Sequence, residues 1–284
     1  MSATLKSAIR DQYGATARGG TDASAAARVA AAFGYSPAEL AAIPEGSNLG
    51  LSCGNPVATA KLREGETVLD LGSGGGLDVF LAAKAVGSTG RAIGLDMTQS
   101  MIDLARRNAA KSGHDNAEFV LGDIEAMPIE SSSVDCVISN CVLNLCPDKP
   151  AAFTEIARVL RPGGRVAISD IALKRALPVD LKESVAAYVG CIAGAILTAE
   201  IEDGLRGAGL CDVLVVPDGA DLNAYAEVDG QAACCAPPAD KAASSCCGAK
   251  TSPDAHAALA ETMRAYDLND YALSVKIYAV KPRA

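Results

Sequence analysis

Val68-Leu69-Asp70-Leu71-Gly72-Ser73-Gly74-Gly75-Gly76 is the stretch of the 284-residue chain that decides the fold. A short apolar strand leads into a glycine-rich turn, and residues 78–85 continue with a helical pattern. Glycine allows positive φ in such a turn and lets the backbone approach a ligand closely. The N–H groups of the turn are then expected to face the ligand. The glycines are more crowded than in the G-x-G-x-x-G fingerprint of nicotinamide dinucleotide sites.

Strand and helix patterns alternate from residue 66 onward. The strand candidates are short, apolar and rich in β-branched residues, which is typical of strands buried on both faces. They are Thr67–Asp70, Ala92–Asp96, Glu118–Leu121, Cys136–Ser139 and Arg165–Asp170. Helical patterns lie between them at Ser100–Lys111, after the capping candidate Thr98, and at Pro150–Leu160. This alternation predicts an α/β fold with a parallel, doubly wound sheet over residues 61–172.

The two flanking regions have different patterns. Residues 1–60 are predicted to be an N-terminal helical segment followed by a loop that carries Cys53, with Ser36 as an N-cap and Glu39 closing a capping box. Residues 173–284 begin with a mostly apolar, helical segment up to Leu197. Composition predicts a mobile, cysteine-rich insert at about 218–255. A helix near 256–266 and strands at 212–216 and 274–281 are expected around it.

Three acids stand at or just after successive strand ends. Asp70 precedes the glycines, Asp96 ends the second strand, and Asp123 follows the third. Because the carboxyl ends of parallel strands share one sheet edge, these carboxylates are expected to line one crevice. We expect Asp70 to meet a cationic ligand, Asp96 to accept ribose hydroxyls, and Asp123 to accept from an adenine amino group.

Composition excludes several classes of partner. Half of the residues are hydrophobic, enough for a sizeable core, and the net charge is −9. That charge argues against nucleic acid and anionic lipid as partners. The longest apolar run, Val185–Leu197, is too short to cross a bilayer and contains two glycines. Residues 1–20 do not form a signal peptide, so we expect a cytoplasmic location and mostly reduced cysteines.

As a set, these motifs resemble the class I S-adenosylmethionine methyltransferases. The resemblance rests on Asp70–Gly76, Asp96, Gly122-Asp123 and Leu160-Arg161-Pro162-Gly163-Gly164. It implies a Rossmann-like core that ends in an antiparallel hairpin, with S-adenosylmethionine as cofactor. The cofactor-binding residues that it implies are Asp70, Gly72, Gly74, Asp96, Met97, Asp123, Ile124 and Asn140.

Two cysteine contexts resemble the arsenite methyltransferases. Cys53 lies in Cys53-Gly54-Asn55-Pro56, and Cys191 lies in Gly190-Cys191-Ile192-Ala193-Gly194-Ala195. The resemblance implies that both thiolates bind trivalent arsenic, a soft ion that prefers sulfur ligands. It implies an enzyme that methylates arsenite or methylarsenite, uses a thioredoxin- or glutathione-type reductant, and serves arsenic detoxification. We expect a monomer.

The chain departs from that family in its other cysteines. It has no cysteine before Cys53 and none just before the last strand, where many members have one. The adjacent pairs Cys234-Cys235 and Cys246-Cys247 are candidates for arsenic capture or inert parts of the insert. The remaining cysteines are expected to pack as small hydrophobic residues. They are Cys136, Cys141, Cys146 and Cys211.

The sequence is also compatible with two other functions. A methyltransferase for a small organic or quinone-like acceptor would use an apolar pocket lined by residues 173–197 and would not depend on thiols. A soft-metal sensor on a degenerate methyltransferase scaffold would explain the paired cysteines, but not the intact acids at the strand ends. A structural zinc site is not indicated, since no C-x-x-C spacing occurs.

Overall fold

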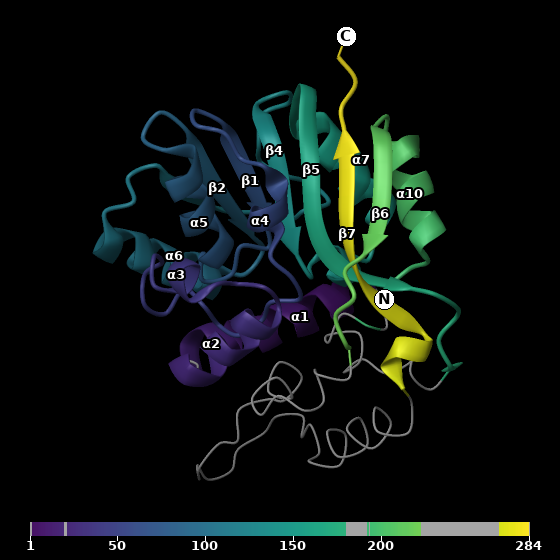
Figure 1. The fold of residues 1–284 in the computed structure, drawn as a ribbon, viewed down its shortest axis with the longest axis horizontal. Coiled ribbons are helices and arrows are strands. Elements are labelled where there is room, and N and C mark those ends of the chain that lie inside the picture. The colour runs from purple at the N-terminus through teal and green to yellow at the C-terminus, as the bar shows by residue number, and fades with distance from the viewer. Residues whose placement is uncertain (1, 20–21, 180–191, 193, 223–266, 284) are drawn as a thin grey trace.

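A seven-stranded mixed sheet with the strand order β3-β2-β1-β4-β5-β7-β6 forms the centre of the molecule (Figure 1). The structure is a computed structural model that describes residues 2–19, 22–179, 192, 194–222 and 267–283. The strands are β1 Thr67–Leu71, β2 Arg91–Asp96, β3 Ala117–Leu121, β4 Val134–Asn140, β5 Leu160–Leu173, β6 Cys211–Pro217 and β7 Ala272–Val280. Each predicted strand is present, usually one to five residues longer at an end.

The first five strands are parallel, and β7 runs antiparallel between β5 and β6. The predicted doubly wound core and C-terminal antiparallel hairpin are therefore confirmed. Edge strand β6 contains a register shift between Cys211 and Leu214, and Asp212 within it has φ +50°. The strand therefore carries a bulge at its start.

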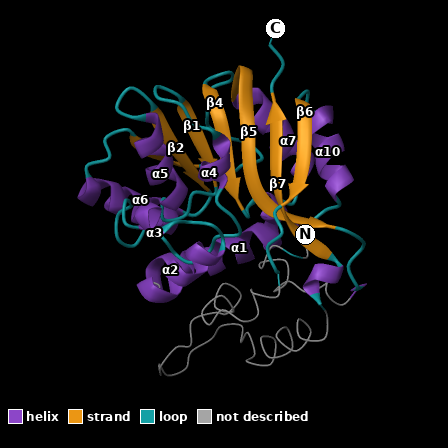
Figure 2. Cartoon of the chain, viewed as in Figure 1, coloured by secondary structure: helices purple, strands orange, loops and turns teal. Residues whose placement is uncertain are grey.

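Helices cover both faces of the sheet and one of its edges (Figure 2). They are α1 Ser2–Gly19, α2 Ala23–Ala32, α3 Pro37–Leu40, α4 Pro56–Ala60, α5 Leu77–Val86, α6 Gln99–Ser112, α7 Lys149–Val159 and α10 Thr198–Gly207. In Figure 1, α1 and α2 lie below the strands, across the edge where the parallel strands end. The N-terminal segment thus covers the edge at which α/β proteins bind ligands.

The strands contribute to a hydrophobic core on each face. Leu69 and Val137 belong to one buried cluster together with Phe153 of α7. Their chain neighbours Val68 and Ile138 belong to a second cluster on the opposite face. Because successive side chains of a strand point to opposite faces, a strand buried on both must be apolar throughout. The unbroken apolar pattern of the central strands has this origin.

Local signals define several helix ends. Ser36 forms the predicted capping box, since its Oγ accepts from the Glu39 N–H and the Glu39 carboxylate accepts from the Ser36 N–H. Thr98 stands at the N-cap of α6 but makes no side-chain capping bond there. The helix α7 is capped by Asp148, whose carboxylate accepts from the Ala151 N–H.

The region after the core differs in part from its prediction. Leu173 was expected to begin a helical segment, but it is the last residue of β5, where it pairs with Ala272. Leu173 is in a strand and not in a helix because the apolar run of β5 continues to pair with β7 up to this residue. Most of the rest of that segment, the helix near 256–266 and most of the insert at 218–255 lie outside the described residues. None of the described helices is long and apolar enough to span a membrane.

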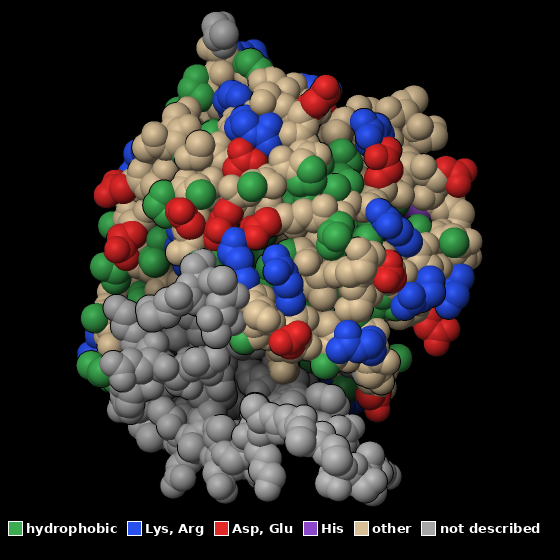
Figure 3. Space-filling model, turned by 180° about the vertical axis from the view of Figure 1, so that it is seen from behind, with side chains coloured by type: hydrophobic (Ala, Val, Ile, Leu, Met, Phe, Trp, Pro, Cys, Tyr) green, Lys and Arg blue, Asp and Glu red, His purple; other side chains and the backbone are tan. Residues whose placement is uncertain are grey.

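Charged side chains of both signs are interspersed over the described residues on the face shown in Figure 3. Among the described residues, Arg158 forms an ion pair with Glu155 on α7, and Arg206 forms one with Glu202 on α10.

Burial predicts the cost of truncating a core leucine. Leu69 is 0% exposed, so Leu69→Ala should lower the free energy of unfolding by about 2–5 kcal/mol. Leu214→Ala is a matched control, because Leu214 is 54% exposed on the edge strand and should cost under about 0.5 kcal/mol. Urea unfolding followed by circular dichroism measures both. Equal losses would contradict the described core.

Candidate active site

An open cleft lies at the carboxyl ends of β1 and β4. Its walls come from the glycine turn, from the loop that precedes α4, and from the end of β4. The loop supplies Ser47, Asn48, Leu49, Leu51 and Ser52, and the turn region supplies Asp70, Gly72, Ser73, Gly74, Gly75, Leu77 and Asp78. The end of β4 supplies Asn140. Four of the predicted cofactor residues, Asp70, Gly72, Gly74 and Asn140, are thus brought together.

The glycine turn is as tight as its sequence predicts, but its N–H groups are used differently. Gly72 has φ +70°, and a Cβ there would overlap the side chain of Val142. The N–H groups of Gly72 and Ser73 both donate to the carbonyl of Leu95, and that of Gly74 donates to Asp96. The expectation that these N–H groups face a ligand is therefore wrong for the three residues. They fasten the turn to the end of β2 instead.

Carboxylates give the cleft a negative character. Asp70 and Asp78 are each 4% exposed. Burial raises the pKa of Asp70 well above its ordinary value, and the charges of Asp78 and Asp96 raise it further. Burial also raises the pKa of Asp78, although hydrogen bonds from Tyr35 and Asn140 oppose the shift. No Lys or Arg is among the described residues that line the cleft. Such a site fits a cationic ligand, which would stabilise the ionised acids.

The other predicted cofactor residues lie around this cleft rather than in its lining. Asp96 ends β2 and accepts from the N–H groups of Gly74 and Thr98. Met97 packs against the cluster that holds Cys53. Asp123 accepts from the ammonium of Lys6 on α1 at 2.7 Å, and Ile124 is buried in the core. Although burial opposes it, the Lys6 hydrogen bond holds the pKa of Asp123 below its ordinary value.

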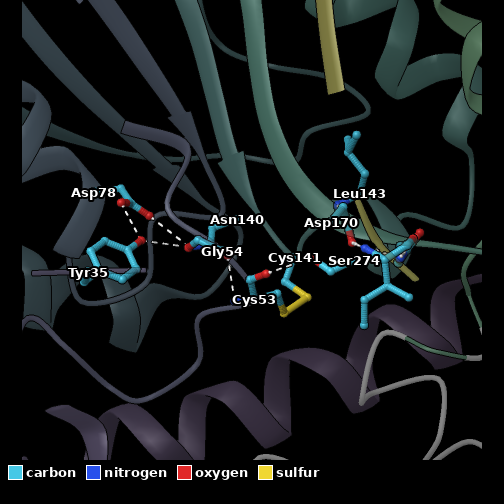
Figure 4. Close-up of a disulfide and its surroundings, with 11 residues drawn as sticks. Tyr35, Cys53, Gly54, Asp78, Asn140, Cys141, Leu143, Asp170 and Ser274 are labelled. Atoms are coloured by element: carbon cyan, nitrogen blue, oxygen red, sulfur yellow. Dashed lines mark hydrogen bonds between the residues drawn. A yellow bond between two sulfur atoms is a disulfide. The ribbon is translucent and has the colours of Figure 1, made fainter. Parts of the chain in front are cut away.

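Cys53 forms a disulfide with Cys141, which follows the end of β4 (Figure 4). The two residues are 88 positions apart in the sequence, with their Cα atoms 5.6 Å apart. Both belong to an apolar cluster that also holds Ile9 of α1. Cys141 is buried in this cluster but does not only pack there as a small hydrophobic residue, so that expectation is wrong, and this pair is the exception to the expected reduced cysteines among the described residues. The sheet edge brings the loop after α3 and the end of β4 to one place.

A partly buried hydrogen-bond network joins this disulfide to the cleft (Figure 4). The Asn140 side chain accepts from the Cys53 N–H at 2.9 Å and donates to the Gly54 carbonyl at 2.7 Å. It also donates to the hydroxyl of Tyr35, 2.9 Å away, and to Asp78 at 3.3 Å. Tyr35 in turn donates to Asp78 at 2.7 Å.

On the other side of the disulfide, Asp170 anchors the turn that follows Cys141. Its carboxylate accepts from the Leu143 N–H at 3.0 Å and from the Asn144 amide at 2.9 Å. Residues Leu143–Leu145 form a short 3-10 helix. Burial raises the pKa of Asp170 to about 7, against the opposing effect of the N–H groups and the Lys149 ammonium.

The remaining cysteines divide into described and undescribed ones. Cys136 and Cys146 are buried as expected, and burial raises the pKa of each thiol to about 12. Cys211 on β6 is only half-buried. Cys191 and the pairs Cys234-Cys235 and Cys246-Cys247 lie outside the described residues. Within the described part of the chain, no three His, Cys, Asp or Glu side chains gather in a group that could hold a metal ion.

Sequence reasoning missed three side chains of this site. Cys141 follows Asn140 directly at a strand end, so its position was an available signal. Asp78 stands two residues after Gly76, in the first turn of α5. Its position directly after the glycine turn was the available signal. Tyr35 lies upstream of α3, and no local pattern connects it with Asp78.

The comparisons with known proteins define the class of protein. Residues 62–220, more than half of the 284 residues, match the family model described as a methyltransferase domain. The chain belongs to this methyltransferase family. The predicted Rossmann-like class I fold is confirmed, and family and fold support S-adenosylmethionine as the cofactor. The acidic cleft fits the positive charge of that molecule.

Particular relatives are arsenite methyltransferases. One from Halobacterium salinarum is 47% identical over 197 residues, which are 69% of this chain and 49% of that protein. One from Aquipseudomonas alcaligenes is 35% identical over 62% of this chain and 52% of that protein. The chain thus spans about half the length of these curated relatives.

A solved structure agrees with them. The arsenic(III) S-adenosylmethionine methyltransferase from Chlamydomonas reinhardtii has a TM-score of 0.57 and 27% identity to this chain. The match covers 90% of this chain and 73% of that one. The resemblance predicted from the sequence is therefore confirmed.

The raised pKa of Asp170 predicts a pH dependence of stability. In the unfolded chain the carboxyl ionises near its ordinary pKa of 3.8, whereas in the folded chain it keeps its proton up to about pH 7. The folded state therefore loses stability as the pH rises from about 4 to about 7. Asp170→Asn removes this effect. The wild-type free energy of unfolding, minus that of the variant, should fall through this window and then level off. A difference independent of pH in urea unfolding would contradict the shift.

Proposed function

We propose that the chain transfers the methyl group of S-adenosylmethionine to trivalent arsenic held by cysteine thiolates, and so serves arsenic detoxification. The observation that carries this proposal is the position of Cys53 and Cys141. Their sulfurs meet beside a cleft that is acidic, glycine-walled and suited to a cationic methyl donor. The names of the relatives at 47% and 35% identity support the same substrate.

The thiols determine what this site can hold. Arsenite and methylarsenite are soft and bind thiolate sulfur in preference to oxygen. Two cysteines whose Cα atoms are 5.6 Å apart can bind one arsenic atom together once they are reduced. Binding displaces their protons, because the ligand is the thiolate. The arsenic keeps a lone pair, which is the nucleophile, so the site needs no general base.

A reductant of the thioredoxin or glutathione type is part of the proposal. The Cys53–Cys141 disulfide must accept two electrons and two protons from such a dithiol or thiol pair before either sulfur can bind arsenic. We also propose that the chain is a cytoplasmic monomer, since a reducing compartment supplies these electrons.

Cys191 is proposed as a further thiolate ligand of arsenic. Its chain neighbour Ile192 is 5% exposed and packs in the same apolar cluster as Cys53 and Cys141. This packing supports a convergence of Cys191 with the other two sulfurs. The pairs Cys234-Cys235 and Cys246-Cys247 are proposed to capture arsenic at low concentration, because adjacent thiols chelate soft metalloids.

On the donor side, the residues present would hold the cofactor by charge and by shape. When bound, S-adenosylmethionine supplies an electrophilic methyl group on a positively charged sulfur. Asp70 offers a buried carboxylate to the cationic part, and Gly72 and Gly74 contribute side-chain-free backbone to the wall of the cleft. Asp96 is proposed to accept the ribose hydroxyls, and Asp123 an adenine amino group, with Met97, Ile124 and Asn140 beside them. Holding donor and acceptor together can contribute roughly 7–11 kcal/mol to such a transfer.

The thiol assignments predict the outcome of a methylation assay with arsenite, S-adenosylmethionine and a thiol reductant. Cys53→Ser, Cys141→Ser and Cys191→Ser should each lower methyl transfer roughly 100-fold, as a misplaced reactant does, while cofactor binding persists. Cys211→Ser on the distant edge strand is the matched control and should retain activity. Retained turnover in the first three variants would reject the arsenic-thiolate site and favour a small organic or quinone-like acceptor.

The donor assignment has a separate test by calorimetry. Asp96→Ala should weaken S-adenosylmethionine binding by about 1–3 kcal/mol, the cost of losing a hydrogen bond to a charged group. Asp103→Ala is the control, because Asp103 is exposed on α6 and bonds only to Gln99 among the described contacts. An unchanged dissociation constant for Asp96→Ala would refute the ribose assignment.

A further inference from the structure

We infer that Asn140 is a positioning residue: its side chain keeps the Cys53 and Cys141 sulfurs next to each other after the disulfide is reduced. This inference rests on the proposed function, in which the reduced pair binds arsenic. It gives Asn140 a task besides lining the donor cleft. The basis is a set of backbone and side-chain hydrogen bonds that do not involve the sulfur atoms.

Asn140 connects the two backbone segments that carry Cys53 and Cys141. It is the chain neighbour of Cys141, so its side chain and that sulfur share one strand end. Across the gap, its amide bonds to the N–H of Cys53 and to the carbonyl of Gly54, at 2.9 and 2.7 Å. One side chain therefore ties together the two backbone segments that carry the sulfurs, in parallel with the covalent bond.

This contact requires an amide side chain at position 140. An N–H group and a carbonyl lie on the two sides of the amide, so its oxygen and nitrogen can each face only one of them. The Tyr35 hydroxyl and the Asp78 carboxylate take the remaining donor capacity. No single smaller side chain supplies an acceptor and two donors in this arrangement. Aspartate keeps the acceptor but loses the donors, and alanine loses both.

The loop that carries Cys53 is closely packed against the sheet. Gly54 lies against β5 so tightly that a Cβ there would come within 2.6 Å of the Ser169 Cβ. The carbonyl of Ser169 accepts from the Cys141 N–H at 2.8 Å, and the Ser274 hydroxyl donates to the Cys53 carbonyl at 3.4 Å. The loop that carries Cys53 thus packs closely against β5 and β7. Asn140, at the end of β4, hydrogen-bonds to the same loop from the other side.

The consequence concerns the reduced state. Without a covalent bond, the two thiols stay adjacent only as far as other contacts hold their backbones together. Each hydrogen bond of the Asn140 side chain contributes modestly, but several on one side chain act together. A preorganised thiol pair binds arsenic, or forms the disulfide again when oxidised glutathione accepts its two electrons and two protons, at a smaller ordering cost. Through Tyr35 and Asp78, the same contacts join the pair to the wall of the donor cleft.

The test measures thiol–disulfide exchange between the full-length protein and a glutathione buffer. Two glutathione molecules give two electrons and two protons to the protein disulfide. The products are one molecule of oxidised glutathione and the protein dithiol. Differential alkylation and peptide mass spectrometry follow Cys53 and Cys141 separately from the other cysteines. Asn140→Ala should shift the equilibrium toward the dithiol by roughly 10-fold, since it removes several partly buried hydrogen bonds.

Asn116→Ala is the matched control. The Asn116 amide also holds backbone, donating to the carbonyls of Ala83 and Gly87 at 2.9 Å each, but it lies beside α5. Its loss should lower stability while leaving the exchange equilibrium unchanged. Tyr35→Phe removes one partner of Asn140 and should shift the equilibrium in the same direction by a smaller factor.

The outcomes separate the inference from the proposed function. An unchanged equilibrium in folded Asn140→Ala, or equal shifts in Asn140→Ala and Asn116→Ala, overturns the inference. If Asn140→Ala does not fold, Tyr35→Phe decides, and an unchanged equilibrium there overturns the inference as well. If the wild-type protein methylates no arsenical but Asn140→Ala still shifts the equilibrium, the positioning role stands and the proposed function falls.

Discussion

Close approach of two backbone segments at the carboxyl edge of the sheet is the constraint on which the site depends. The loop at Cys53 reaches β5 only because Gly54 has no side chain. The glycine turn packs against Val142 only because Gly72 has none. These two approaches place a thiol pair and an acidic cleft side by side. The proposed methyl transfer to an acceptor on sulfur depends on this juxtaposition.

Electrostatics at this edge follow from burial. Asp70 and Asp78 are almost fully buried, and no Lys or Arg of the described lining neutralises them. Ionised carboxylates in such a place are costly unless a cation or hydrogen-bond donors stabilise them. Asp96 and Asp78 have internal donors, whereas Asp123 has the ammonium of Lys6 from α1. The cleft is therefore most complementary to a positive ligand near Asp70.

Much of the fold was predictable because each central strand carries its own signal. Unbroken apolar runs mark strands buried on both faces, and the glycine turn and the acids mark one edge. The end of β5 was not predictable, since an apolar run such as Ile171–Leu173 suits a strand or a helix, and only pairing with β7 decides between them.

The site was predictable only where its residues lie in local motifs. Asp70, Gly72 and Gly74 are such residues. The pairing of Cys53 with Cys141 depends on contacts across 88 residues, and the bond between Tyr35 and Asp78 spans 43. No periodicity or spacing records contacts of that kind. The use of the turn N–H groups within the protein was likewise hidden, because it depends on where the end of β2 lies in space.

The bulge at the start of β6 has a consequence for how the molecule meets its own copies. An exposed outer strand offers unpaired N–H and carbonyl groups, and Leu214 and Val216 add apolar surface there. A regular strand of this kind is a template for intermolecular β-pairing and aggregation. The positive φ at Asp212 and the register shift before Leu214 break that template at one end. The edge thereby carries a built-in protection against sheet extension between molecules.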